Sequence, residues 1–291
     1  MPLHSRPAPV QLLCVDNQTN RRAASYEVTG NKIEVASYKT TTSCVLTNGP
    51  VTFMVQKTDN VLTFQEGLTY LVMNYGTYTR FGLECMSIEP TTKIYRSAPL
   101  EVSEEIQRRA KHILNPPSPE MTGDEADLFT GSSYVSLRGH IENMFSYRMI
   151  HRNDGDVPIR DLILRCGERL IEVSLWQDEA LAELHIGAEI VVTHLRATIK
   201  SNGKAKFNSS RFSSVEVPDH PHTREWFTII GFLENEDDLV LLAENYDEYS
   251  MSADLFPGTS SDFLEKLPLN VEVEQANYRV YSIQYSDVVE E

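Results

Sequence analysis

The stretch that decides the fold covers residues 157–217 and reads VPIRDLILRCGERLIEVSLWQDEALAELHIGAEIVVTHLRATIKSNGKAKFNSSRFSSVEV. It contains two short β-rich segments joined by a turn at Gly167, a helix-like segment after Trp176, a long apolar segment, a Ser-Asn-Gly turn and a last β-rich segment. Alternating apolar residues bounded by turn residues predict β-strands. With residues 134–150 as the first strand, the order is strand, strand, strand, helix, strand, strand.

This order of elements is that of the OB-fold, a five-stranded Greek-key barrel. Residues 20–97 give a similar order, with a strand pair, an Asn-Gly-Pro turn and further strands, and residues 221–291 give it once more. We therefore predict an all-β protein with short helices, made of tandem five-stranded OB-fold barrels. The predicted barrels cover residues 20–97, 134–217 and 221–291, and the second matches the pattern best.

Residues 98–133 are predicted to form a helix followed by an acidic linker that contains prolines. Ser103 is placed to cap a helix whose first turn holds Glu104 and Glu105 and whose last turn is basic, an arrangement that suits the helix dipole. The Asn-Pro-Pro-Ser-Pro run that follows ends this helix. The acidic stretch up to residue 133 is predicted to be a flexible connection between the first two barrels.

The charge of the chain is distributed unevenly. The formal net charge is −16 at pH 7, yet residues 218–291 hold 17 Asp and Glu against 3 Lys and Arg, whereas residues 134–217 hold 11 of each sign. The acidic C-terminal unit should repel phosphate, so its charge is either a solvated surface or a surface that docks a protein. We favour a protein partner for this unit.

A strip without acidic residues lies in the predicted middle barrel. Residues 190–215 contain no Asp or Glu, and their five cations fall on the fourth strand, the following turn and the fifth strand. In an OB-fold the turn between strands four and five is one wall of the binding groove. A positive strip at this place suits contact with phosphates. Its members are Arg196, Lys200, Lys204, Lys206 and Arg211.

Two aromatic residues near this strip are candidate platforms on which unpaired bases stack. In a strand that buries Ile171, Val173 and Leu175, Trp176 is assigned to the outer face. The alternative is that Trp176 closes the barrel end or packs under the following helix. Phe207 is the second candidate, and its position along the strand leaves a role in the core equally open.

The first barrel offers a further aromatic cluster in the segment YGTYTRF. This segment corresponds to the groove-lining turn of the barrel, and three rings with one cation suit base stacking supported by cation–π contacts. Burial of each ring in a β-rich core is the alternative. The candidate residues are Tyr75, Tyr78, Arg80 and Phe81.

The run RDLILRCGERLIEVSLWQDEA at residues 160–180, with the later FNSSRFSSVEV, resembles the tandem single-stranded-DNA-binding OB domains of the replication protein A large subunit. This resemblance implies that Trp176, which ends a V-x-L-W pattern, and Phe207 stack on bases. Two features depart from that family: the turn tip at residues 201–203 has no aromatic residue, and the cysteines are scattered singly, without a zinc ribbon. We therefore expect a divergent relative of that family.

The sequence contains no Walker loop, G-x-S-x-G, H-E-x-x-H or C-x-x-C motif. We therefore expect no enzyme activity, no cofactor and no metal, and we interpret Asp154, Asp156 and Asp161 as parts of a polar turn rather than as a Mg²⁺ site. Unpaired cysteines suit reduced thiols, and no apolar run reaches the roughly 18 residues of a membrane span. We expect an intracellular, nuclear protein without membrane contact.

Two functions from different classes follow from these features. The first is non-catalytic binding of single-stranded nucleic acid, with DNA favoured and RNA as the alternative, by base stacking and phosphate neutralisation across tandem OB-folds. Such a protein would serve DNA replication or repair. The second is an OB-fold scaffold that mediates protein–protein contacts through its acidic C-terminal unit. Oligosaccharide binding is a weaker third option, because the basic strip does not suit a neutral sugar.

Overall fold

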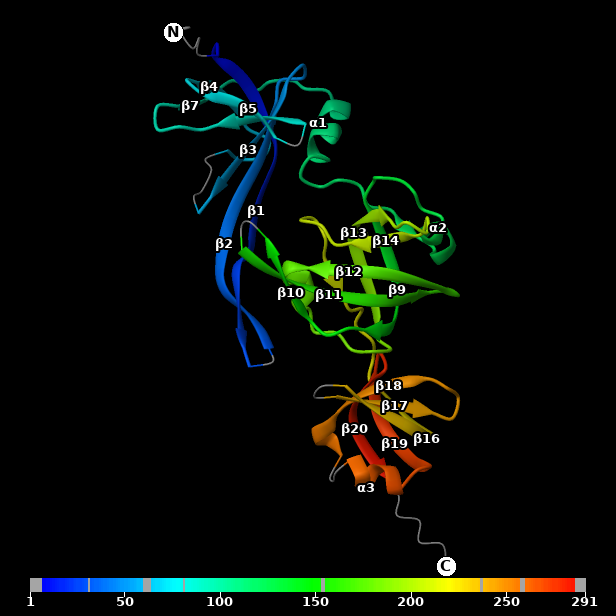
Figure 1. The fold of residues 1–291 in the computed structure, drawn as a ribbon. Helices are drawn as coiled ribbons and strands as arrows, with labels where there is room; N and C mark the ends of the chain where they lie inside the picture. Colours follow the sequence, from blue (N-terminus) through cyan, green and yellow to red (C-terminus); the bar gives the residue numbers. More distant parts are fainter. Residues whose placement is uncertain are drawn as a thin grey trace, which may run out of the picture. The chain divides into compact units, whose positions relative to one another are not determined.

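The computed structural model describes residues 7–30, 32–59, 64–80, 82–152, 155–235, 238–256 and 260–285. These residues form mostly β-structure with short helices (Figure 1). The chain divides into two compact units, Met1–Pro117 and Ser118–Glu291. Within the described part of the chain, no helix has the length and apolar character that crossing a lipid bilayer requires.

The first unit is one β-sheet with a short helix. Its elements are β1 (Val10–Thr29), β2 (Lys32–Thr47), β3 (Thr52–Thr58), β4 (Thr69–Met73), β5 (Gly76–Arg80), β6 (Leu83–Ser87), β7 (Lys93–Arg96) and α1 (Glu104–Lys111). The strands follow the order β5-β6-β3-β2-β1-β4-β7, and β6 runs parallel to β3. The fourth strand of an OB-fold is divided here, because β4 pairs with β1 whereas β5 pairs with β6.

This first barrel begins earlier than the predicted boundary at residue 20. The strand β1 starts at Val10, and Leu12 and Cys14 on it are fully buried in the core. The apolar run that includes these residues therefore belongs to the barrel. Beyond the core, β1 and β2 continue as a long two-stranded ribbon that turns at Gly30, whose φ of +64° suits a residue without a side chain (Figure 1).

The second unit begins with a five-stranded barrel and its extensions. The elements are β8 (Glu120–Met121), α2 (Gly123–Asp127), β9 (Val135–Met144), β10 (Arg148–Arg152), β11 (Gly155–Cys166), β12 (Arg169–Trp176), β13 (Glu189–Ile199), β14 (Ala205–Asn208) and β15 (Val215–Glu216). A 3₁₀ turn (Gln177–Leu181) stands between β12 and β13. The pairing order β9-β11-β12-β14-β13 returns to β9, with β12 and β14 parallel, which is the OB-fold order.

The predicted flexible linker up to residue 133 is wrong, because its second half is folded onto this middle barrel. Thr122 caps α2, and its side chain and the Glu125 carboxylate form a reciprocal capping box. Ala126 on α2 is fully buried in the barrel core, and β8 pairs in parallel with β9. The capping signal and the apolar residues beside it outweigh the acidic composition that suggested disorder. The predicted helix before it is present as α1.

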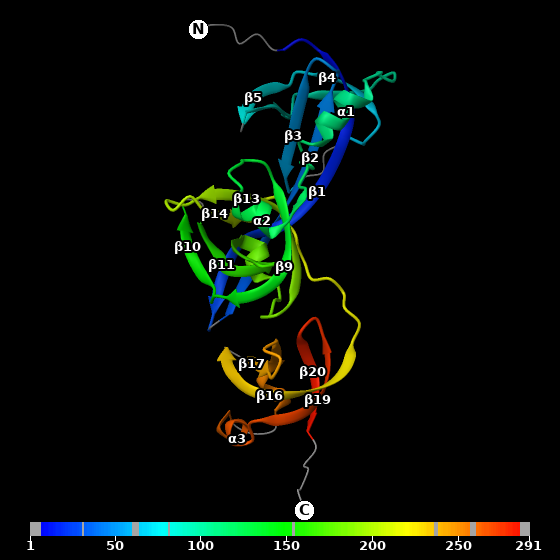
Figure 2. The ribbon, with the colours of Figure 1, turned by 90° about the vertical axis from the view of Figure 1, so that its right-hand side faces the viewer.

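The rest of the second unit is a closed barrel in the order β16-β17-β18-β20-β19. Its elements are β16 (Thr223–Asn235), β17 (Asp238–Ala243), β18 (Glu248–Ser252), α3 (Ser260–Glu265), β19 (Leu269–Ala276) and β20 (Arg279–Tyr285). The strands β18 and β20 run parallel. The helix α3 lies between the third and fourth strands in the chain, directly before β19, as in an OB-fold (Figure 2). The predicted fold class, all-β with short helices and five-stranded barrels, is confirmed.

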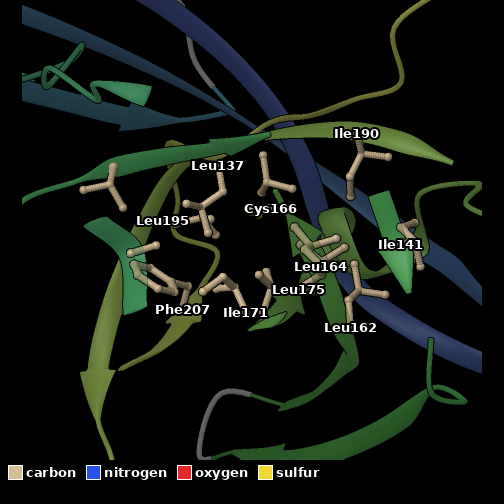
Figure 3. Packing of buried hydrophobic residues seen from close by; sticks show 14 of the residues in the cluster. Leu137, Ile141, Leu162, Leu164, Cys166, Ile171, Leu175, Ile190, Leu195 and Phe207 are labelled. Carbon is tan, nitrogen blue, oxygen red and sulfur yellow. The ribbon is translucent and has the colours of Figure 1, made fainter. Parts of the chain in front are cut away.

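The middle barrel is filled by apolar side chains from alternate positions of its strands. Figure 3 shows Leu137 and Ile141 of β9 and Leu162 and Leu164 of β11 directed to a common interior. Each fully buried side chain of this kind stabilises the fold by roughly 1.5–3 kcal/mol. The residues at the positions between these buried ones therefore point to the outer face, where the candidate site lies.

Candidate nucleic-acid interface

Trp176 ends β12 on the outer side of the middle barrel, and its ring is partly buried. The indole Nε1 donates a hydrogen bond to Oδ1 of Asn208 at 3.2 Å, and the Trp176 backbone N–H donates to Oγ of Ser209 at 2.8 Å. Both partners come from the end of β14 and the residue after it. The indole is therefore held in one orientation by the strand that runs parallel to its own.

The chain turns sharply directly after Trp176. Gln177 adopts a φ of +56°, a left-handed backbone conformation that is energetically unfavourable for residues other than glycine. Such strained positions cluster at binding sites, where the surrounding structure holds them in place. The turn leaves the indole at the rim of an open cleft of about 340 Å³, which Trp176, Asn208, Arg152 and Arg211 line.

Two arginines and the carboxylate of Glu179 line this cleft. The Arg152 guanidinium lies over the Trp176 ring, 4.5 Å from its centroid, and Arg211 lies 4.6 Å from the centroid of Phe212. A guanidinium over an indole is a cation–π contact, and it keeps a cation next to the aromatic surface. The cleft thus combines a flat ring, an amide, two cations and one carboxylate, and the ring and the cations are kinds of group that contact bases and phosphates.

The carboxylate of Asp161 lines a second hollow of the barrel surface, together with Lys206. Asp161 on β11 accepts hydrogen bonds from Nζ of Lys206 at 2.9 Å, from a guanidinium nitrogen of Arg148 at 2.7 Å and from Oγ of Ser174. Burial raises the pKa of Asp161, but these hydrogen bonds outweigh burial and lower the pKa from 3.8 to about 2. Asp161 is therefore ionised at neutral pH and neutralises two cations of the face.

We expect Asp161→Asn to lower the free energy of unfolding at pH 7 by on the order of 2 kcal/mol. Because the folded pKa is depressed, the stabilisation is present above about pH 4 and is lost as the pH falls towards about 2. The difference in free energy of unfolding between wild type and variant should therefore become smaller on acidification, as measured by urea unfolding at several pH values. Asp219→Asn, at an exposed position, controls for the loss of one charge. A difference in free energy of unfolding that grows on acidification would contradict the lowered pKa of Asp161.

The predicted strip of cations without counter-charges is wrong for its three lysines. Lys200 contacts both carboxylate oxygens of Glu172 at 2.7 Å, Lys206 contacts Asp161, and Lys204 lies 3.6 Å from an oxygen of Asp127. The carboxylates come from β12, β11 and α2, so a charge count along residues 190–215 does not detect them. Arg196 is placed 5.2 Å from the centroid of the Tyr134 ring.

The predicted stacking role of Phe207 is wrong, because its side chain is 0% exposed. In the parallel pairing of β14 with β12, Phe207 lies opposite Val173, and paired residues share a face. Val173 points into the barrel, so Phe207 does too, among Ile171 and Leu195 (Figure 3). The register of β14 therefore directs Phe207 inward and Asn208 towards Trp176.

Phe145 and Arg152 lie beside the predicted residues Lys206 and Trp176, although no sequence pattern indicated them. Phe145 is 49% exposed and follows β9, where its backbone N–H donates to the carbonyl oxygen of Asp161 at 3.0 Å. Arg152 ends β10, a strand that pairs with β11. The sequence predicts residues 134–150 as one strand, because the break at residue 145 has no turn signal of Gly or Pro. This break places Arg152 at the cleft and Phe145 in a separate hollow with Asp161.

In the first unit, Tyr75 is buried and the prediction of a stacking role for it is wrong. Its ring packs edge-on against Phe53 with centroids 6.0 Å apart, and its hydroxyl donates to the carbonyl oxygen of Ala8 at 3.2 Å. Tyr78 is 42% exposed on β5, and Arg80 two residues later is exposed on the same face. Phe81 lies outside the described residues.

The acidic residues considered for Mg²⁺ do not come together in the described part of the chain. There, no group of three or more His, Cys, Asp or Glu side chains is placed to hold a metal ion. Asp156 pairs with His151, and Asp161 is occupied by its cationic partners. Asp154 lies outside the described residues. All four cysteines are free and buried.

The fold is that of a protein made of tandem OB-fold barrels, and the cleft at Trp176 lies on the middle one. No protein-family model and no curated protein matches the sequence. Similar solved structures include the HINb domain of p204, at 13% identity and a TM-score of 0.40 over 73% of this chain and 98% of that chain. A replication protein A heterotrimer bound to ssDNA matches at 9% identity and a TM-score of 0.37, over 98% of this chain and 94% of that chain.

A third similar structure is p202 HIN1 in complex with a 12-mer of dsDNA. It matches at 14% identity and a TM-score of 0.34, over 73% of this chain and 94% of that chain. Identities and TM-scores at this level assign neither a family nor a function to this chain.

Proposed function

We propose that this protein binds single-stranded nucleic acid at the middle barrel, with Trp176 as the ring on which a base stacks. The observation that carries the proposal is the cleft itself. The indole of Trp176 is fixed by Asn208, is partly exposed and has a guanidinium over it. A rigid aromatic surface next to cations is the arrangement by which OB-folds hold unpaired bases.

The residues of the cleft have separate roles in this proposal. Trp176 supplies stacking energy, which is tolerant of sequence because every base has a π-face. Arg152 and Arg211 are exposed and neutralise phosphates on either side of the stacked base. The lysines bound to Asp161 and Glu172 contribute less to affinity, because carboxylates of the same face already neutralise them.

A single strand suits this cleft better than a duplex does. In a duplex the faces of the bases are stacked on one another, so the indole has no ring to contact without unpairing. The preference for DNA over RNA rests on the resemblance of residues 160–180 to replication protein A domains. The third barrel, with its excess of acidic residues, is not part of this site.

The test is fluorescence anisotropy of a labelled dT strand of about 30 nucleotides, long enough for two OB-fold sites. We expect saturable binding at low salt that weakens with added salt, with a slope of log K against log salt of about −1 to −2, since two arginines each neutralise one phosphate. An rU strand and a duplex of the same length serve as competitors. Absence of binding at low salt, or equal binding of the duplex, would refute the proposal.

Protein binding through the acidic third barrel is the second candidate function. It is favoured by a specific observation, an exposed tryptophan beside acidic residues on that barrel.

A further inference from the structure

The third barrel carries an exposed aromatic face that the proposed nucleic-acid site does not use. Trp226 on β16 is 62% exposed, and Tyr281 on β20 is 51% exposed. The ring of Tyr281 packs against that of His222, with centroids 4.6 Å apart and ring planes tilted by 30°. Among the described residues of this barrel a third ring, that of Tyr246, is also exposed. Trp226 and Tyr281 differ from it because strand pairing and the His222 contact place them beside the same acidic residues, and exposed rings gathered on one face indicate an interaction surface.

Strand register places acidic residues directly beside Trp226. Trp226 lies opposite Glu272 of β19, and Glu272 lies opposite Gln284 of β20. The next row towards the start of β16 pairs Arg224 with Glu274. Trp226, Glu272 and Gln284 therefore form one row across three strands, and Glu274 stands in the adjoining row on the same outer face.

The two glutamates of this face differ in how they are neutralised. Glu274 accepts hydrogen bonds from His222 at 3.2 Å and from Arg224 at 3.5 Å. Among the residues that the structure describes, no cation forms an ion pair with Glu272. Within the described residues, the face thus presents an indole beside a carboxylate that forms no ion pair.

The barrel geometry limits how a partner can bind here. Because the five strands close on one another, β16 and β19 have no free edge to which a strand could be added. A partner must therefore contact the side chains of the face. An arginine or lysine side chain fits both groups at once, with its charge over the indole and in ionic contact with the carboxylate.

We propose that the face of Trp226, Tyr281, Glu272 and Glu274 docks a basic segment of a partner protein. The sign of the charge selects this occupant, because residues 218–291 hold 17 acidic against 3 basic residues and repel nucleic acid. A second copy of this chain is the alternative occupant, and sedimentation distinguishes it from a basic partner segment. Aromatic residues surrounded by charges that complement the partner are typical of the few residues that contribute most of the binding energy of an interface.

The chain offers a direct fluorescent readout because it contains two tryptophans. In the full-length Trp176→Phe variant, Trp226 is the sole indole. The probe is a peptide of about 12 residues made of Arg, Lys and Leu, and an acidic peptide of equal length is the comparison ligand; cation–π contact with the indole gives the expected signal. We expect a saturable change in Trp226 emission with the basic peptide at physiological salt and none with the acidic peptide.

Two charge-reversal variants distinguish binding at this defined face from general attraction of the peptide to an acidic barrel. Glu272→Lys should weaken binding of the basic peptide about tenfold or more, since it places a cation where the peptide's cation binds. Glu265→Lys makes the same change of charge on exposed α3 and should weaken binding less than about twofold, as a distant surface charge does. Circular dichroism confirms that each variant is folded.

Three outcomes would overturn the proposal. Equal weakening by both reversals would show attraction to net charge without a defined face. An unchanged Trp226 emission at saturating peptide would show that the indole is not contacted. Concentration-dependent dimerisation in sedimentation experiments, abolished by Trp226→Ala, would assign the face to a second copy of the chain.

Discussion

Replacing Trp176 by alanine is expected to weaken binding of a single-stranded oligonucleotide by roughly 5- to 150-fold, which corresponds to about 1–3 kcal/mol for one stacked base. The substitution removes the ring while leaving Arg152 and Arg211 in place, so the remaining affinity should be mainly electrostatic. The salt dependence should therefore stay the same while the affinity falls at every salt concentration. Fluorescence anisotropy at two salt concentrations measures both quantities.

The chain supplies a matched control for this experiment. Trp226→Ala removes an exposed tryptophan of the same kind from the third barrel, so it should leave oligonucleotide affinity unchanged. Trp176→Phe keeps an aromatic face and should retain most of the affinity. If Trp176→Ala is folded and binds as tightly as the wild type, Trp176 is not the stacking residue, and the exposed Phe145 on the same face becomes the next candidate.

Replacing Phe207 by alanine is expected to lower the free energy of unfolding of the middle barrel by about 3–5 kcal/mol, the usual cost of deleting a buried phenyl ring. The ring is 0% exposed and lies among the side chains of the barrel core, including Val173, so its removal leaves a cavity. Urea unfolding followed by Trp176 fluorescence, in a Trp226→Phe background, reports on this barrel alone.

Two further variants separate a role of Phe207 in the core from a role in stacking. Phe207→Leu keeps most of the apolar volume, so it should recover most of the stability and leave oligonucleotide affinity near that of the wild type. Phe145→Ala removes an exposed ring of the same kind and should change stability by about 0.5 kcal/mol or less. A stable Phe207→Ala protein with a large loss of affinity would instead make Phe207 a binding residue.

Local patterns in the sequence were sufficient for the fold class and for the position of Trp176. Alternation of apolar residues predicts the strands, and the order of strands, helix and turns predicts an OB-fold, because each of these signals is contained within a few neighbouring residues. Trp176 is assigned to the outer side by the strand that contains it, without knowledge of other strands. The helix at Glu104–Lys111 follows from its charges for the same reason.

Only the tertiary structure decided which groups meet at the site. The partners of Lys200, Lys204 and Lys206 lie between 28 and 77 positions away in the chain, on β12, α2 and β11. The inward direction of Phe207 depends on the register of β14 against β12. Neither the ion pairs nor the strand register is a local property, because strand pairing brings together residues that lie far apart in the sequence. A short sequence pattern cannot indicate such contacts. The sequence thus determined the barrels, and strand pairing determined the charge and the exposed rings of their faces.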